Sequence, residues 1–106
     1  MPRVTFVHPD GREETHAAPV AHSVLDCALD NAVPGLLGQC GGAAICGTCQ
    51  CYVAAEWFPL LPRADDVEQE LLPYLFEPRP ASRLACQIRL TEGLDGLRVL
   101  LPVRQV

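Results

Sequence analysis

Four cysteines have a spacing that can hold a metal cofactor. Cys40, Cys46, Cys49 and Cys86 follow the pattern C-x5-C-x2-C-x36-C. Four thiolates form the ligand set of a [2Fe–2S] cluster. The spacing therefore predicts that these cysteines bind such a cluster and that the chain transfers electrons, without carrying out substrate chemistry itself.

The residues between the first three cysteines suit a cluster-binding loop. They are small or uncharged: Gly41, Gly42, Ala43, Ala44, Ile45, Gly47 and Thr48. Small side chains let backbone N–H groups approach the negatively charged sulfurs closely. We expect the backbone of this loop to surround the cluster.

Other cysteine chemistries fit the pattern less well. Cys46 and Cys49 form a C-x2-C pair, but a thioredoxin-type pair needs a βαβ context that the sequence lacks. A structural zinc site usually combines two such pairs, and it stays open as a distant alternative. A Rieske centre needs two histidine ligands. The three histidines all precede the loop, where solvated or core positions are expected: His8, His16 and His22.

The elements that must position the cysteines alternate irregularly between strand and helix patterns. Strand patterns cover residues 3–8, 13–18, 51–54, 84–90 and 96–101. Helix patterns cover residues 23–31, with Ser23 as N-cap and Asp26 three residues on, and about 65–72. This order predicts an α+β fold in one domain spanning residues 1–106.

Both helices carry an apolar face. The first is expected to bury Val24, Leu25, Ala28, Leu29 and Ala32, and the second to bury Val67, Leu71, Leu72 and Leu75. Outside the ligand set, Cys27 and Cys51 are interpreted as small buried apolar residues. Trp57 is interpreted as a core anchor.

The composition excludes several partner classes. The chain has 106 residues and a formal charge of −5, and all eight of its basic residues are arginine. An acidic surface repels nucleic acid and anionic lipid and favours basic protein partners. Solubility alone also accounts for net acidity, and composition does not choose between these two explanations. No apolar run is long enough to span a bilayer. A strand-like alternation begins near the N-terminus, so we expect no targeting segment. We expect a cytoplasmic protein, in which cysteines hold metal and do not form disulfides.

The second helix begins with a cluster of acids: Asp65, Asp66, Glu68 and Glu70. Asp65 and Glu68 can cap the helix, and acids in the first turn favour its dipole. Capping does not require Asp66 or Glu70. Capping therefore leaves the presence of these two acids unexplained.

The segments Cys40–Cys49 and Ser82–Ile88 together resemble the adrenodoxin/putidaredoxin-type [2Fe–2S] ferredoxins. This resemblance covers nearly the whole chain and implies a β-grasp fold with a mixed sheet, a packed helix and a cluster-binding loop. It also implies one-electron transfer from an NAD(P)H-dependent FAD flavoprotein, a ferredoxin reductase, to a terminal oxygenase. The oxygenase implied first is a cytochrome P450. The resemblance implies as well that the acidic helix is the docking surface for reductase and P450, with Asp66 and Glu70 as the best candidates for partner binding and Asp65 and Glu68 beside them. A Rieske-type ring-hydroxylating oxygenase and iron–sulfur cluster assembly are the alternatives, and we expect a monomer.

The chain departs from this family at four positions. Many relatives have histidine directly after the third ligand, where this chain has Gln50, and a supporting tyrosine at the position of Phe76. We expect the link between the cluster loop and the acidic helix to be bonded differently as a result. Gln39 and Val106 also replace residues that relatives use toward their partners, so partner specificity is expected to differ.

Overall fold

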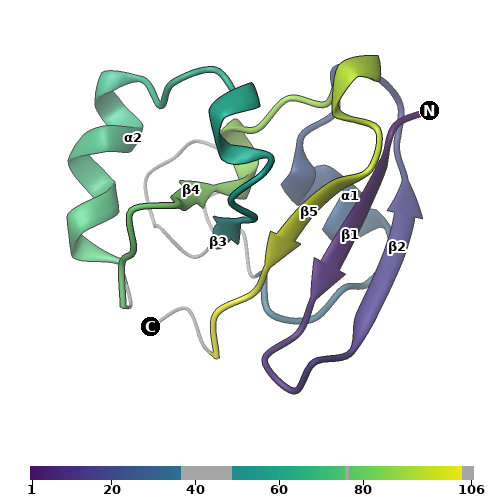
Figure 1. Ribbon diagram of the computed structural model, residues 1–106, viewed down its shortest axis with the longest axis horizontal. Helices are drawn as coiled ribbons and strands as arrows, with labels where there is room; N and C mark the ends of the chain where they lie inside the picture. Colours follow the sequence, from purple (N-terminus) through teal and green to yellow (C-terminus); the bar gives the residue numbers. More distant parts are fainter. Residues whose placement is uncertain (37–48, 76, 104–106) are drawn as a thin grey trace.

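The computed structural model describes residues 1–36, 49–75 and 77–103. Its strands form one sheet in the order β2-β1-β5-β3-β4 (Figure 1). β1 pairs antiparallel with β2 and parallel with β5, whereas β3 pairs antiparallel with both β4 and β5. The strands are β1 (Arg3–Val7), β2 (Glu13–Ala17), β3 (Gln50–Val53), β4 (Ser82–Leu84) and β5 (Leu97–Leu100). The predicted α+β architecture with a mixed sheet is confirmed.

The N-terminal hairpin is confirmed, and its turn depends on a glycine. Gly11 has φ of +91°, a left-handed conformation that costs glycine little. The backbone N–H of His8 donates to the carbonyl of Arg12 at 2.8 Å and closes the turn. The hairpin forms one edge of the sheet, at the opposite end from β4.

Helix α1 (Val24–Asp30) begins with the predicted capping box. The Ser23 hydroxyl accepts from the Asp26 backbone N–H, and the Asp26 carboxylate accepts from the Ser23 N–H, both at 3.0 Å. The helix packs on the sheet through Val24, Leu25, Cys27 and Ala28. The expected burial of Leu29 and Ala32 is wrong, since Leu29 is 49% exposed and Ala32 lies exposed beyond the end of the helix.

Helix α2 (Asp66–Leu71) lies at the β4 end of the molecule (Figure 1). Asp65 caps it by accepting from the Glu68 N–H at 2.8 Å. A short 3₁₀ helix, Leu72–Tyr74, follows where Pro73 interrupts α-helical bonding. Leu71 and Leu75 pack against the core as expected, but Val67 is 56% exposed and Glu68 only 1%. The helix is therefore rotated relative to the orientation that its apolar pattern predicts.

The strand predicted over residues 84–90 is largely wrong. β4 ends at Leu84, and the short 3₁₀ helix Ala85–Gln87 follows it. Beyond this turn, Arg89 makes only an isolated bridge with Ser23. The apolar residues of this segment are buried by a turn instead of a strand, and the turn carries Cys86.

The core lies between α1 and the sheet. Its largest fully buried side chains include Phe6, Leu25, Leu84, Leu90 and Leu97. Trp57 is partly buried against this core, as expected of an anchor. Gly96 has φ of +99°, and a Cβ there would lie 3.4 Å from the Trp57 ring. In the part of the chain that the structure describes, no helix combines the length and apolarity needed to cross a membrane.

Candidate iron–sulfur site

The described structure brings two of the four predicted ligands together. Cys49 immediately precedes β3, and Cys86 lies in the turn after β4. The two strands pair so that Gln50 is opposite Leu84, and the Ala85 N–H donates to the Cys49 carbonyl at 2.9 Å. The other two predicted ligands, Cys40 and Cys46, lie outside the described residues, as do the predicted loop positions 41–45, 47 and 48.

Cys49 and Cys86 form a buried thiol pair. Both are free cysteines, exposed by 1% and 2% respectively. Hydrogen bonding with Cys86 and burial together raise the pKa of the Cys49 thiol well above its usual value. A buried thiolate needs a positive partner, and a bound metal supplies one by displacing the protons. This donor chemistry fits an iron–sulfur cluster.

A cluster at this pair would need further ligands from the cysteine loop. Within residues 1–36, 49–75 and 77–103, no three histidine, cysteine or acidic side chains come together in a metal-binding group. The remaining ligands would therefore have to come from residues 37–48, where Cys40 and Cys46 lie. The four-cysteine ligand set stays a prediction, and the positions of Cys49 and Cys86 are compatible with it.

Gln50 joins the ligand strand to the segment before β4. Its side chain is fully buried, and its Oε1 accepts from the Ser82 hydroxyl at 2.8 Å. The same hydroxyl accepts from the Arg79 N–H at 2.8 Å. Phe76, the other departure expected to alter this link, lies outside the described residues.

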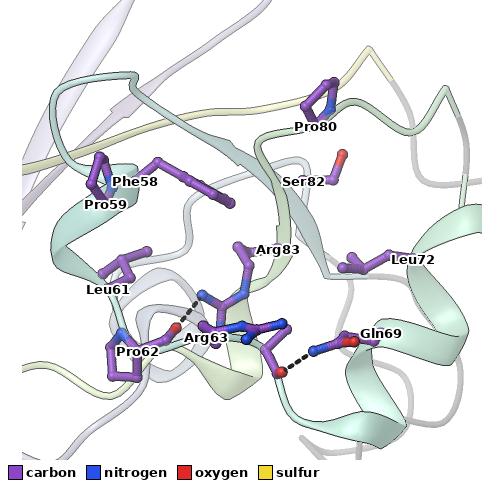
Figure 2. Close-up of a pocket in the computed structure, with 11 residues that line it drawn as sticks. Phe58, Pro59, Leu61, Pro62, Arg63, Gln69, Leu72, Pro80, Ser82 and Arg83 are labelled. Carbon is purple, nitrogen blue, oxygen red and sulfur yellow. Dashed lines mark hydrogen bonds between the residues drawn. The ribbon is translucent and has the colours of Figure 1, made fainter.

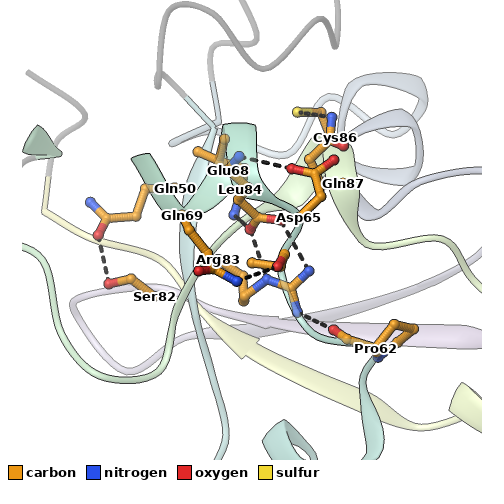
Figure 3. A network of polar contacts seen from close by, with 11 residues as sticks. Gln50, Pro62, Asp65, Glu68, Gln69, Ser82, Arg83, Leu84, Cys86 and Gln87 are labelled. Carbon is orange, nitrogen blue, oxygen red and sulfur yellow. Dashed lines mark hydrogen bonds and ion pairs between the residues drawn. The ribbon is translucent and has the colours of Figure 1, made fainter. Parts of the chain in front are cut away.

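Glu68 is a correction to the expected partner surface. Its carboxylate accepts from Arg83 Nε at 2.7 Å, from Arg83 Nη2 at 3.1 Å and from the Leu84 N–H at 2.8 Å (Figure 3). Arg83 also donates to the Pro62 carbonyl at 2.9 Å. Glu68 is unavailable to a partner because this ion pair holds it inside. It ties α2 to the strand that leads to Cys86.

Packing near this ion pair is incomplete. A hollow of about 330 Å³ separates the 3₁₀ helix Phe58–Leu60 from α2 and β4 (Figure 2). Phe58, Leu61 and Leu72 line it, and Arg83 crosses it toward Pro62. The polar contacts of Glu68 and Arg83 attach α2 beside this hollow, in addition to the packing of Leu71 against the core.

The exposed side of α2 carries the other predicted acids together with apolar groups. Asp65, Asp66 and Glu70 are exposed. Val67 is 56% exposed, and Tyr74, seven residues further on, is 87% exposed. Sequence reasoning missed Tyr74 as a surface group. Tyr74 ends the 3₁₀ helix Leu72–Tyr74 that follows α2.

The remaining cysteines are buried away from solvent, as interpreted from the sequence. Cys27 and Cys51 both have no exposed surface. Burial raises the pKa of Cys27 to about 11 and that of Cys51 to about 12. Both therefore stay neutral thiols near neutral pH.

Two of the three histidines have a partner in the hairpin. His8 Nε2 and His16 Nε2 contact the two oxygens of Glu14 at 2.6 and 2.8 Å. Hydrogen bonds from His16 and then His8 lower the pKa of Glu14. These contacts account for His8 and His16 without a metal.

Comparison with known proteins places the site in a family. Residues 7–91 match the 2Fe-2S iron-sulfur cluster binding domain. The chain is 40% identical over 107 residues to rhodocoxin from Rhodococcus erythropolis, with the whole of both chains covered. It matches the crystal structure of a ferredoxin from Rhodopseudomonas palustris HaA2 with a TM-score of 0.95 and 42% identity, over 99% of this chain and 100% of that one.

A further structural match is putidaredoxin in its covalent complex with putidaredoxin reductase. The TM-score is 0.92 and the identity 35%, over 96% of this chain and 99% of that one. These matches confirm the β-grasp fold, the [2Fe–2S] cofactor and the expectation of an electron carrier that is not an enzyme. The chain belongs to the adrenodoxin/putidaredoxin-type [2Fe–2S] ferredoxins.

Proposed function

We propose that this ferredoxin carries single electrons from an NAD(P)H-dependent FAD flavoprotein reductase to a terminal oxygenase, a cytochrome P450 in the first instance. Its cluster is held by Cys40, Cys46, Cys49 and Cys86. The observation that carries the proposal is the connection between an exposed acidic helix and a cluster ligand. Asp66 and Glu70 face solvent, and Glu68 between them is bonded to Leu84, two residues before Cys86.

The exposed face of α2 has the composition of a protein-docking surface. Asp65, Asp66 and Glu70 supply negative charge next to the exposed Val67, and the exposed Tyr74 follows in the 3₁₀ helix Leu72–Tyr74. Aromatic side chains at the centre of an interface supply much of its affinity, while surrounding charges steer association. A partner with basic residues around an apolar patch would fit this face. The match to putidaredoxin bound to its reductase supports such a partner.

The docking surface is tested with Asp66→Asn and Glu70→Gln in a reductase-coupled assay. Each variant is expected to lower the rate of reduction at low ionic strength roughly twofold to fivefold, because one steering charge is lost. High salt should remove the difference. Glu92→Gln is the matched control, since it removes an equally exposed acid outside α2. Equal effects of all three variants would contradict the proposed surface.

The electron acceptor is tested by reconstitution. The reduced ferredoxin is offered to P450 and Rieske-type oxygenases of the source organism, and substrate-dependent NAD(P)H oxidation is measured. Turnover only with a P450 supports the proposal, whereas turnover only with a Rieske-type enzyme supports the first alternative. If the ferredoxin supports no oxygenase but does support iron–sulfur cluster assembly, the second alternative, electron donation to cluster assembly, is favoured. The single-domain organisation, monomeric state and cytoplasmic location stay predictions.

The ligand set is tested by replacing Cys86 with serine. A serine oxygen in place of sulfur should shift the visible absorption and electron paramagnetic resonance spectra, or prevent cluster binding. Cys51→Ser is the control, because Cys51 is equally buried and lies two residues from Cys49. Parental spectra for Cys86→Ser would remove Cys86 from the ligand set.

A further inference from the structure

The side chain of Gln87 contacts the sulfur of the neighbouring cysteine. Its Nε2 donates to Cys86 Sγ at 3.3 Å (Figure 3). Gln87 ends the 3₁₀ helix Ala85–Gln87 and is half-buried. The contact therefore lies at the edge of the buried thiol pair, where a side-chain donor reaches a sulfur that is itself only 2% exposed.

The other described cysteine of the pair is also followed by glutamine, but that side chain bonds elsewhere. Gln50 lies in β3 and uses its oxygen to accept from Ser82. Gln87 lies in a tight turn, which lets its amide fold back onto Cys86. The tight turn that follows Cys86 thus brings the amide of the next residue back to the cysteine sulfur.

We propose that Gln87 sets the reduction potential of the cluster through its hydrogen bond to Cys86. This role goes beyond the carrier function proposed above, and it requires that Cys86 is a cluster ligand. Reduction adds one electron, and the ligand sulfurs become more negative. A hydrogen-bond donor is then held more strongly in the reduced state than in the oxidised state, so it raises the potential. No bond forms or breaks in this step. Gln87 acts through Cys86 and is a positioning residue.

The test replaces Gln87 with methionine, which has a similar length but no N–H donor. The full-length, cluster-loaded variant is titrated to obtain its midpoint potential. Only the difference in the strength of this hydrogen bond between the two redox states changes the potential. We therefore expect the equilibrium constant for reduction to fall by roughly twofold to tenfold, and a tenfold fall is a negative shift of about 59 mV for one electron. Gln87→Leu removes the donor with a different shape and should shift the potential in the same direction.

Resonance Raman spectra supply a second readout. Losing the donor should change the iron–sulfur(Cys) stretching frequencies and remove part of their shift in deuterated water. Gln69→Met is the matched control, since Gln69 is exposed on α2 and donates to the Ala64 carbonyl. It should leave both the potential and the Raman spectrum unchanged.

Two failures can be told apart. If Cys86→Ser changes the cluster spectra but both Gln87 variants keep the parental potential and Raman frequencies, the role of Gln87 is refuted and the ligand set stands. If Cys86→Ser leaves the spectra unchanged, both the ligand assignment and this inference are refuted. Equal shifts in Gln87→Met and Gln69→Met would also overturn the inference.

Discussion

Replacing Glu68 with glutamine removes the charge that joins helix α2 to the ligand strand. The Glu68 carboxylate accepts two hydrogen bonds from Arg83 and one from the Leu84 N–H. Glutamine keeps the shape but turns one acceptor oxygen into an NH₂ group that faces other donors. The guanidinium of Arg83, whose side chain is 6% exposed, is left without its countercharge.

The expected cost is large for a domain of this size. Removing one partner of a buried ion pair costs about 3–5 kcal/mol. We expect about 3 kcal/mol for Glu68→Gln, at the low end of this range, because an amide oxygen at the position of Oε2 can still accept two of the three bonds. Small domains are stable by only about 5–15 kcal/mol. If half of the loss appears in the unfolding barrier, unfolding becomes roughly tenfold faster.

The assay follows loss of visible absorbance in urea under anaerobic conditions. Cluster loss makes unfolding irreversible, so rates are compared and not equilibrium constants. Glu70→Gln is the matched control, since it makes the same change two residues away on the exposed side and should alter stability by less than about 0.5 kcal/mol. If Glu68→Gln loses its cluster no faster than Glu70→Gln, the reasoning about the buried pair is refuted.

Three further changes probe other parts of the structure. Asp26→Asn should weaken the capping box and lower the free energy of unfolding in urea by about 1 kcal/mol. The backbone hydrogen bond from Ser23 lowers the pKa of Asp26 in the folded protein, so the loss is fully present above the unfolded-state pKa of about 3.9. A loss that changed between about pH 5 and 8 would contradict this assignment. Tyr74→Ala should raise the KM of the reductase for the ferredoxin about fivefold or more, as loss of an aromatic interface contact of roughly 1 kcal/mol or more predicts, without altering urea stability. An unchanged KM would remove Tyr74 from the docking face. Ser82→Ala removes the hydroxyl that joins Gln50 to Arg79 and should cost about 1 kcal/mol; parental urea stability would show that this link contributes nothing.

The sequence could predict those elements whose signals are local. The hairpin follows from strand alternation around the Asp10–Gly11 turn, and the start of α1 follows from Ser23 and Asp26, which satisfy each other within four residues. The pairing of Cys49 with Cys86 was expected from the spacing of cysteines. Each of these signals is carried by residues whose chemistry allows few alternatives.

The rotation of α2 could not be predicted from its own residues. Apolar periodicity places Val67 inside and leaves Glu68 at the border, since an acid normally avoids the core. The partner that reverses this order is Arg83, fifteen residues further along the chain. A buried ion pair between residues far apart in the sequence produces no recognisable hydrophobic periodicity in either segment.

The end of β4 was missed for a related reason. Residues 84–90 alternate as a buried strand does, but burial is also achieved by the turn Ala85–Gln87. Hydrophobic pattern reports that Leu84 and Ile88 are inside and does not report which backbone conformation puts them there. The same turn allows the contact between Gln87 and Cys86, which an apolar pattern does not predict.

A reductive titration of the purified protein tests the central claim most directly. The account predicts visible charge-transfer bands that bleach on uptake of one electron per chain and a paramagnetic signal from the reduced [2Fe–2S] cluster. A colourless protein that binds zinc at its cysteines and accepts no electron would contradict it.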